Sequence, residues 1–217
     1  MLIQLSSKTE FHQAFKMSAL CKMLGASKDV RTDGRVITAV ELCNVLNNET
    51  LNLQQSGAVK EIYIFKLTLA EKRIPSLFIT ALDKFTNFHT VFVLECDDEQ
   101  ILYGALKERT DKGFKIGKYY STEWTSTPTP VTLPVDIATL DEAYTALIDA
   151  LIPLTTRPNE TTADFVARYE QIVKLNKEIS KLQQQVDTER QPKRRFDLND
   201  KLKELKKELE KYARQSN

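Results

Sequence analysis

The sequence predicts an α+β protein: a mostly antiparallel sheet with helices on one face, followed by a C-terminal antiparallel helical hairpin. The order of the elements indicates the sheet layer. An apolar β-type stretch is followed by one helical stretch and then by a run of further strands, an order that does not suit a doubly wound parallel sheet. A second observation indicates the hairpin, because residues 161–217 contain two apolar heptad patterns with a proline between them.

The chain has 217 residues, of which 41 % are hydrophobic and 28 % charged, as in ordinary globular proteins. This length suits one globular body with an accessory element. We predict an α+β body over 1–125, a Pro/Thr-rich connector over 126–134, a packing helix over 135–155 and the hairpin over 161–217.

The first predicted element is a capped amphipathic helix from about Thr9 to Leu24, because Ser and Thr precede apolar residues at helical spacing and Gly25 follows. The next apolar segment, "RVITAVELCNVL" at 35–46, suits either a strand or a helix. We favour a strand for its first half, and the structure of residues 26–52 is otherwise left open.

The central strand is predicted in "VKEIYIFKLTL", where β-branched and aromatic residues fill both faces. A helix is expected in "IPSLFITALDKF", with Pro75 at its start. Three further strands joined by polar hairpin turns follow in "HTVFVLEC", "QILYGALK" and "GFKIGKYYSTEW". After the connector, "TLDEAYTALIDALIPL" predicts a short helix that ends near Pro153, and Thr161 or Thr162 should cap the next helix.

The hairpin prediction rests on apolar residues spaced alternately three and four apart on either side of Pro192. This partner or self-association seam comprises Ile172, Leu175, Ile179, Leu182, Val186, Leu198, Leu202, Leu205, Leu209 and Tyr212. Because each arm has only about three heptads, it should pack on the body, on a second copy or on a partner. A protein partner is therefore expected, and a homodimer is left open.

Few residues suit catalysis, so we predict no catalytic residue, cofactor or metal site. His12, expected on the first helix, and His89, at the entry to a strand, have no motif around them. The cysteines, Cys21, Cys43 and Cys96, are too far apart for a CxxC pair and are expected to be buried apolar residues.

An acidic turn offers a weak alternative, a metal-dependent nuclease. Glu95, Asp97, Asp98 and Glu99 end one strand and begin the next, and we expect them close to Lys107. A simple acidic hairpin turn explains the same residues.

A nucleic-acid-binding module is the stronger alternative. Residues 161–217 contain 14 Lys or Arg and 10 Asp or Glu, an excess of +4. The cations Lys193, Arg194 and Arg195 follow Pro192, where they could contact phosphates, while Trp124 or Tyr120 could stack on a base. A solvated turn between two helices explains the same cations without a ligand.

Localisation is expected to be cytoplasmic. No run of about 18 apolar residues occurs, and "MLIQLSSKTEFHQ" lacks the features of a signal peptide. No contact with a membrane is expected.

Three segments together resemble a known family: "VKEIYIFKLTLAEKRIP", "LDKFTNFHTVFVLE", and "YYSTEW" with a later "LIPL" and a charged coiled-coil tail. They are similar over most of the chain to the uncharacterised bacterial family called domain of unknown function 4391. The resemblance implies genes beside helicases and DNA methyltransferases of restriction-like or anti-phage defence loci. It therefore implies a non-catalytic accessory protein that docks on such a partner, and it transfers no functional residue.

Overall fold

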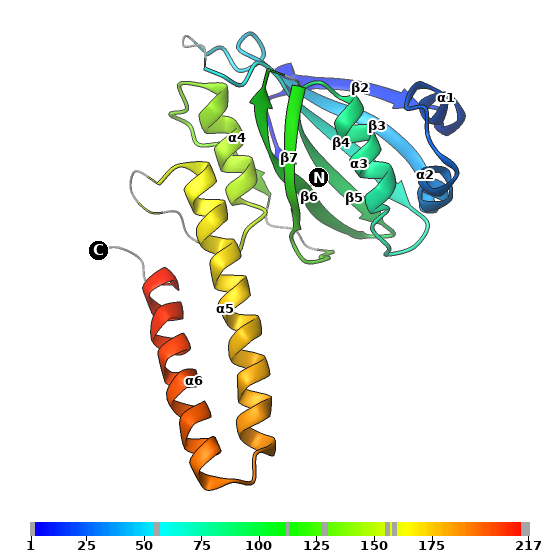
Figure 1. Cartoon of the computed structure of the whole chain (residues 1–217). Helices are drawn as coiled ribbons and strands as arrows, with labels where there is room; N and C mark the ends of the chain where they lie inside the picture. Colours follow the sequence, from blue (N-terminus) through cyan, green and yellow to red (C-terminus); the bar gives the residue numbers. More distant parts are fainter. Residues whose placement is uncertain are drawn as a thin grey trace. The chain divides into compact units, whose positions relative to one another are not determined.

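The computed structural model describes residues 3–53, 57–111, 113–126, 130–154, 157 and 160–213. The chain forms two compact units, Met1–Pro153 and Leu154–Asn217 (Figure 1). The first unit contains the sheets and four α-helices, and the second contains two long helices, counted over the described residues.

The main sheet of the first unit has six strands among the described residues, in the order of the chain. They are β2 (Glu10–Phe15), β3 (Ile37–Leu46), β4 (Ile62–Leu69), β5 (His89–Cys96), β6 (Glu99–Thr110) and β7 (Gly113–Ser121). All neighbours pair antiparallel except β4 and β5, which are parallel and are joined through helix α3 (Ser76–Phe85). A separate parallel pair is formed by β1 (Ile3–Gln4) and β8 (Val131–Thr132).

The core lies where α3 covers one face of this sheet (Figure 1). Phe78 and Leu82 of α3 are buried against apolar side chains of the central strands, such as Phe92. The start of α3 is held by Asp33, whose Oδ2 accepts from the amides of Leu77 (2.8 Å) and Phe78 (3.1 Å). The sequence thus places α3 both by its apolar stripe and by a distant capping carboxylate.

The remaining helices of this unit are short. They are α1 (Met17–Met23), α2 (Lys28–Asp33) and α4 (Leu140–Asp149), with 3-10 turns at Ser7–Thr9 and Gly34–Val36. Thr139 caps α4 by accepting from the amide of Glu142 at 3.3 Å. Just beyond α4, Leu151 lies over Gly104 on the face opposite α3, where a Cβ on the glycine would come within 3.0 Å of Leu151 Cδ1. Helical segments therefore flank both faces of the sheet rather than one.

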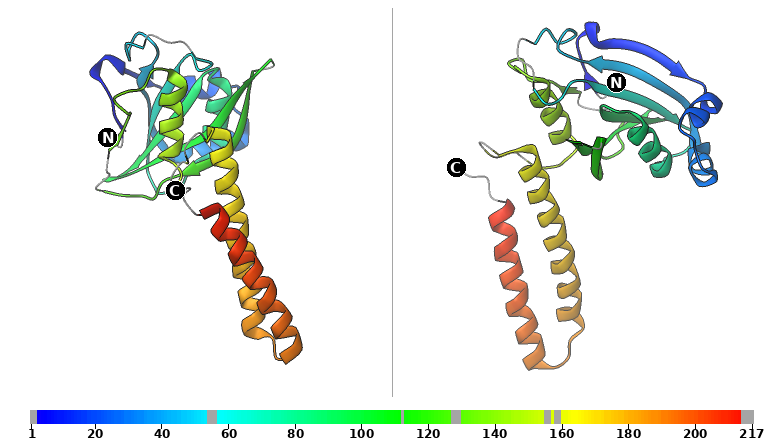
Figure 2. Two further views of the ribbon diagram at one scale, coloured as in Figure 1. Left: turned by 90° about the vertical axis from the view of Figure 1, so that its left-hand side faces the viewer. Right: turned by 45° about the horizontal axis from the view of Figure 1, so that its top comes forward.

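The second unit is the expected antiparallel hairpin, formed by α5 (Thr162–Thr188) and α6 (Pro192–Ala213), which lie side by side in both views of Figure 2. The amide of Asp164 donates to the side chain of Thr161 at 3.1 Å, which confirms the predicted cap. Leu175, Val186 and Leu202 are buried. The α+β class and the hairpin are both confirmed.

One local prediction, the helix from about Thr9 to Leu24, is wrong. Residues 10–15 form the edge strand β2, and only 17–23 of the expected first helix is helical. Phe11 and Phe15 are four residues apart, a spacing that places side chains on one face of a strand as well as of a helix, and pairing with β3 decides the outcome. The strand favoured for the first half of 35–46 is confirmed, and it continues through the second half as β3, Ile37–Leu46.

No helix in the described part of the chain is long and apolar enough to cross a lipid bilayer.

Candidate functional site

An open apolar groove of about 630 Å³ lies beside the edge strand β2. Its walls come from five elements, β2, α1, β3, β4 and α3, and from the loop that follows α3. The lining residues are Phe11, Gln13, Phe15, Leu20, Met23, Leu42, Val45, Asn47, Glu61, Tyr63, Phe65, Leu82, Phe85, Thr86, Asn87 and Phe88. The groove is thus continuous with the core beneath α3.

Large apolar side chains stand exposed around this groove. Phe11, Met23 and Phe85 are 54 %, 53 % and 52 % exposed, although they come from three different elements. The floor is formed by buried residues, including Phe65 and Leu82. Clustered exposed apolar residues beside a concave apolar surface are typical of a protein-binding site.

The polar groups of the groove are few. Glu61 is the charged residue among the described residues that line the groove, and its carboxylate accepts a hydrogen bond from Tyr63. Burial first, and then the hydrogen bond and charge of Glu61, together raise the pKa of Tyr63 to about 12, so the phenol stays neutral at physiological pH. The Tyr63 ring lies 4.9 Å from the ring of Phe88, centroid to centroid. The surface therefore offers aromatic contacts rather than catalytic groups.

Sequence reasoning missed this groove because it assigned Phe11 and Phe15 to the single amphipathic helix expected from about Thr9 to Leu24. In the structure the chain turns after β2, so Phe11 and Met23 belong to separate elements. The signal in the sequence was the apolar spacing itself, which fits two secondary structures.

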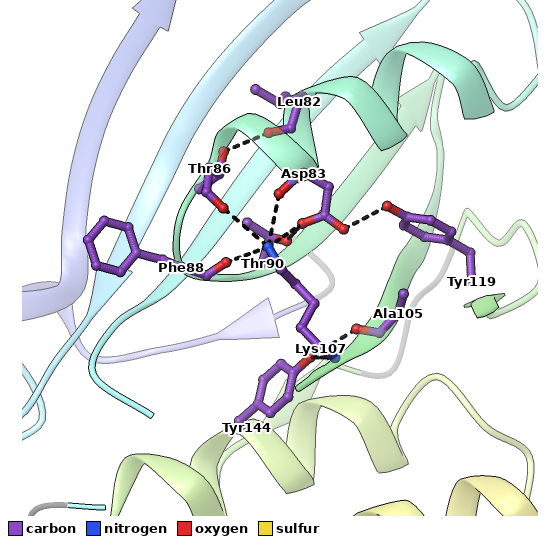
Figure 3. Close-up of polar contacts among 9 residues, drawn as sticks. All are labelled: Leu82, Asp83, Thr86, Phe88, Thr90, Ala105, Lys107, Tyr119 and Tyr144. Carbon is purple, nitrogen blue, oxygen red and sulfur yellow. Dashed lines mark hydrogen bonds and ion pairs between the residues drawn. The ribbon is translucent and has the colours of Figure 1, made fainter. Parts of the chain in front are cut away.

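A second notable feature is a buried polar cluster around Lys107 of β6 (Figure 3). Its Nζ donates to Asp83 Oδ1 at 2.8 Å, and both side chains are 0 % exposed. The same Nζ donates to the carbonyl oxygens of Asp83 (2.9 Å), Thr86 (3.2 Å) and Phe88 (2.5 Å). Lys107 thereby satisfies carbonyl groups where α3 ends.

The carboxylate of Asp83 is also fully engaged. Tyr119 donates its hydroxyl to Asp83 Oδ2 at 2.6 Å, and the hydroxyl of Thr90 donates to Oδ1. Burial lowers the pKa of Lys107, while the neighbouring Asp83 opposes this shift. Every polar atom of the pair faces a partner within the protein, so the cluster joins α3 to β6 and β7 and leaves no group free for a substrate.

The acidic turn does not form the metal centre that the nuclease alternative requires. Lys107 lies eight residues beyond Glu99 on the same strand, about 26 Å away at the rise of a β-strand, so its expected closeness to the turn is wrong. Glu95 pairs with Lys66 at 3.6 Å, and Glu99 pairs with Lys72 at 2.7 Å. No three potential ligands come together for a metal ion within the described ranges.

The predicted stacking residues lie against the core. Tyr120 is buried, with Lys118 Nζ 5.6 Å from its ring centroid. Trp124 is half-buried against the core cluster. The ring of Tyr120 therefore has no exposed face on which a base could stack.

The three predicted phosphate-contacting cations lie in the first turn of α6, not in the connecting turn as expected, because the helix begins at Pro192. Lys193, Arg194 and Arg195 are all exposed. The first turn of α6 contains no acidic residue.

The seam residues face each other within one chain. Leu175, Val186 and Leu202 are buried, and the other seven are half-buried: Ile172, Ile179, Leu182, Leu198, Leu205, Leu209 and Tyr212. The hairpin thus uses its apolar stripe internally, and its use by a second chain stays a prediction.

The histidines occupy contrasting places. His12 is on β2 with φ 53°, and its Nδ1 lies 2.9 Å from Glu41 Oε1, which raises the pKa of this exposed ring. His89 is buried beside Tyr144, and burial followed by the charge of Lys107 lowers its pKa to about 4. Neither ring lies in the groove.

The predicted burial of the cysteines holds for two of the three. Cys43 and Cys96 are buried, whereas Cys21 of α1 is only half-buried.

Comparison with known proteins gives one match. The profile of a family described as domain of unknown function (DUF4391) matches residues 19–209, most of the chain. No curated protein and no solved structure matches. The matched range includes the groove walls from α1 to α3, the buried Lys107 cluster and nearly all of the hairpin. The chain belongs to the DUF4391 family.

Proposed function

We propose that this chain is a non-catalytic interaction protein that docks a protein partner in the apolar groove beside β2. The observation that carries the proposal is the group of half-exposed Phe11, Met23 and Phe85 over a buried apolar floor. Because Phe11 and Phe85 are already half buried, covering their exposed halves contributes about 1.5–3 kcal/mol in total, which helps to anchor a partner. Aromatic residues and methionine are also enriched at protein interfaces.

The proposed partner is a helicase or DNA methyltransferase encoded beside the gene in a bacterial restriction-like or anti-phage defence locus. This part of the proposal is supported by the family to which the chain belongs and by the gene neighbourhood that the resemblance implies. The hairpin, which the sequence favoured as the docking device, closes its apolar seam internally. The groove is therefore the better-supported docking surface.

The test is co-purification of the chain with each neighbouring helicase or methyltransferase after co-expression. Phe11→Ser with Phe85→Ser should lose the complex, because both anchors leave the groove. Leu77→Ser is a matched control, since Leu77 is 53 % exposed on α3, like Phe85 at its other end, but does not line the groove. A groove variant that folds as judged by circular dichroism and still co-purifies at the wild-type level would refute the proposal.

A second candidate function is phosphate contact by the first turn of α6, supported by its three exposed cations and by the positive end of the helix dipole there. Binding of a labelled DNA duplex or single strand should then weaken steeply with salt. Changing Lys193, Arg194 and Arg195 to Ala should reduce both affinity and salt dependence. Affinity that is unchanged by the triple substitution would exclude this candidate.

A further inference from the structure

A second pocket, on the other side of α1 from the apolar groove, has a different chemistry. Its volume is about 540 Å³, and its walls come from α1, α2 and the turn that leads into β3. The helix α1 gives Leu20 and Met23 to the groove but Ser18 and Lys22 to this pocket. The two surfaces therefore belong to opposite sides of one short helix.

Three cations line the pocket: Lys22 from α1, Arg31 from α2 and Arg35 from the 3-10 turn. All three are exposed, and none forms an ion pair with a carboxylate among the described residues. Arg31 Nε donates to the carbonyl of Ala26 at 3.0 Å, which fixes the side chain while leaving the other guanidinium nitrogens available. Three positive charges that line one pocket, none of them paired with a carboxylate among the described residues, favour an anion.

The nearby acidic residues do not neutralise these cations. Asp33 is committed to Arg73 at 2.8 Å and to the amides that begin α3. Asp29 is two residues before Arg31 on α2, a separation that places two side chains on different sides of a helix. Neither carboxylate lines the pocket.

The rest of the lining suits the flat part of a ligand. Met17, Cys21 and Ile37 supply apolar surface, and Ser18 supplies a hydroxyl that can donate to an oxygen. A volume of this size accommodates a small organic ligand. A lining that combines cations with apolar side chains suits a nucleotide, in which a phosphate is joined to an aromatic base.

We infer that this pocket binds a phosphate-bearing ligand of nucleotide size, with Lys22, Arg31 and Arg35 contacting the phosphate and Met17 with Ile37 contacting the base. The ligand is either a free nucleotide or one nucleotide of a nucleic-acid strand, since both present the same chemistry. This site lies outside the docking groove and outside the first turn of α6, so the inference does not depend on either proposed function.

Cys21 allows the site to be located directly, because it lines the pocket and is half-buried while Cys43 and Cys96 are buried. The rate of alkylation of Cys21 by a maleimide would be measured by peptide mass spectrometry with adenosine monophosphate, with a 12-nucleotide single strand, and with ionic-strength-matched sodium chloride. Either phosphate ligand should slow the reaction severalfold, while the chloride should not. Protection by the mononucleotide identifies a free nucleotide, and protection by the strand alone identifies nucleic acid.

Variants make the test specific. Lys22→Ala with Arg35→Ala should abolish protection and weaken binding about tenfold or more, as expected when charge-assisted contacts are lost. Lys28→Ala is the matched control, because Lys28 is an exposed cation of α2 that does not line the pocket. Equal protection in the double variant and in Lys28→Ala, or no protection of the wild type by either phosphate ligand, would overturn the inference.

Discussion

At the scale of the residue, Lys107 illustrates how a buried charge can be structural rather than catalytic. Its ammonium faces one carboxylate oxygen and three carbonyl oxygens in the described part of the chain. Such a pair is costly to break, because removal of one partner leaves the other charge buried and uncompensated. The sequence could not reveal this, since Lys107 and Asp83 are on different elements and both residue types are usually exposed.

Lys107→Met should therefore destabilise the protein by about 3–5 kcal/mol, because it leaves the buried carboxylate of Asp83 without a counter-charge and the carbonyl groups at the end of α3 without their hydrogen-bond donor. Equilibrium unfolding in urea, followed by tryptophan fluorescence, measures the change. Adding Asp83→Asn to Lys107→Met should recover part of the loss, because the uncompensated charge is gone. A loss below about 1 kcal/mol for Lys107→Met, the range of an exposed pair, would contradict this assignment.

His89 should make the protein sensitive to acid. Its folded pKa of about 4 lies below the unfolded value of 6.5, so the unfolded chain binds more protons between these values and stability falls as the pH drops through this window. The difference between the folded and the unfolded pKa corresponds to a loss of about 3 kcal/mol between pH 6.5 and 4.

Urea unfolding at a series of pH values would measure this loss. His89→Phe keeps a ring beside Tyr144 and should make the free energy of unfolding nearly independent of pH between 4 and 6.5. His12→Asn, a change at an exposed position, should leave the pH dependence of the free energy as in the wild type. The same slope in His89→Phe and wild type would show that other groups cause the acid response.

At the scale of the element, sequence patterns predicted the segments whose residues satisfy one periodicity. The central strands and α3 were predicted because β-branched runs, and an apolar helical stripe that begins after Pro75, each fit a single structure. The edge strand β2 was missed because its aromatic spacing fits both a strand and a helix, and because pairing with β3, 25 to 34 residues away, settles the choice. The candidate groove was missed with it, since β2 supplies one wall.

Within the hairpin, the seam should account for most of the stability of its two helices. Leu202→Ala removes a buried side chain between α5 and α6 and should cost about 2–4 kcal/mol of local stability. Hydrogen exchange of the α5 and α6 amides measures this, and Phe196→Ala, which truncates a side chain that is 64 % exposed, is the control. Equal exchange rates in the two variants would mean that the seam contributes little.

At the scale of the whole molecule, the chain combines two surfaces of opposite character in its first unit. The groove gathers exposed apolar residues, and the α1–α2 pocket gathers unpaired cations. Counting charges along the sequence indicated an anion-binding surface in the C-terminal tail, because the cations of α1 and α2 lie within a body whose net charge is negative. Clustering of like charges is a property of the fold, and composition alone does not report it.

The central claim is that the apolar groove is the docking surface. The most direct measurement is the Kd of the co-purifying helicase or methyltransferase for Phe85→Ser relative to Leu77→Ser, two changes at equally exposed positions of one helix. Because only Phe85 lines the groove, its substitution should weaken binding by about tenfold or more, with Leu77→Ser close to the wild type. Kd values that agree within about twofold for the two variants would contradict the claim.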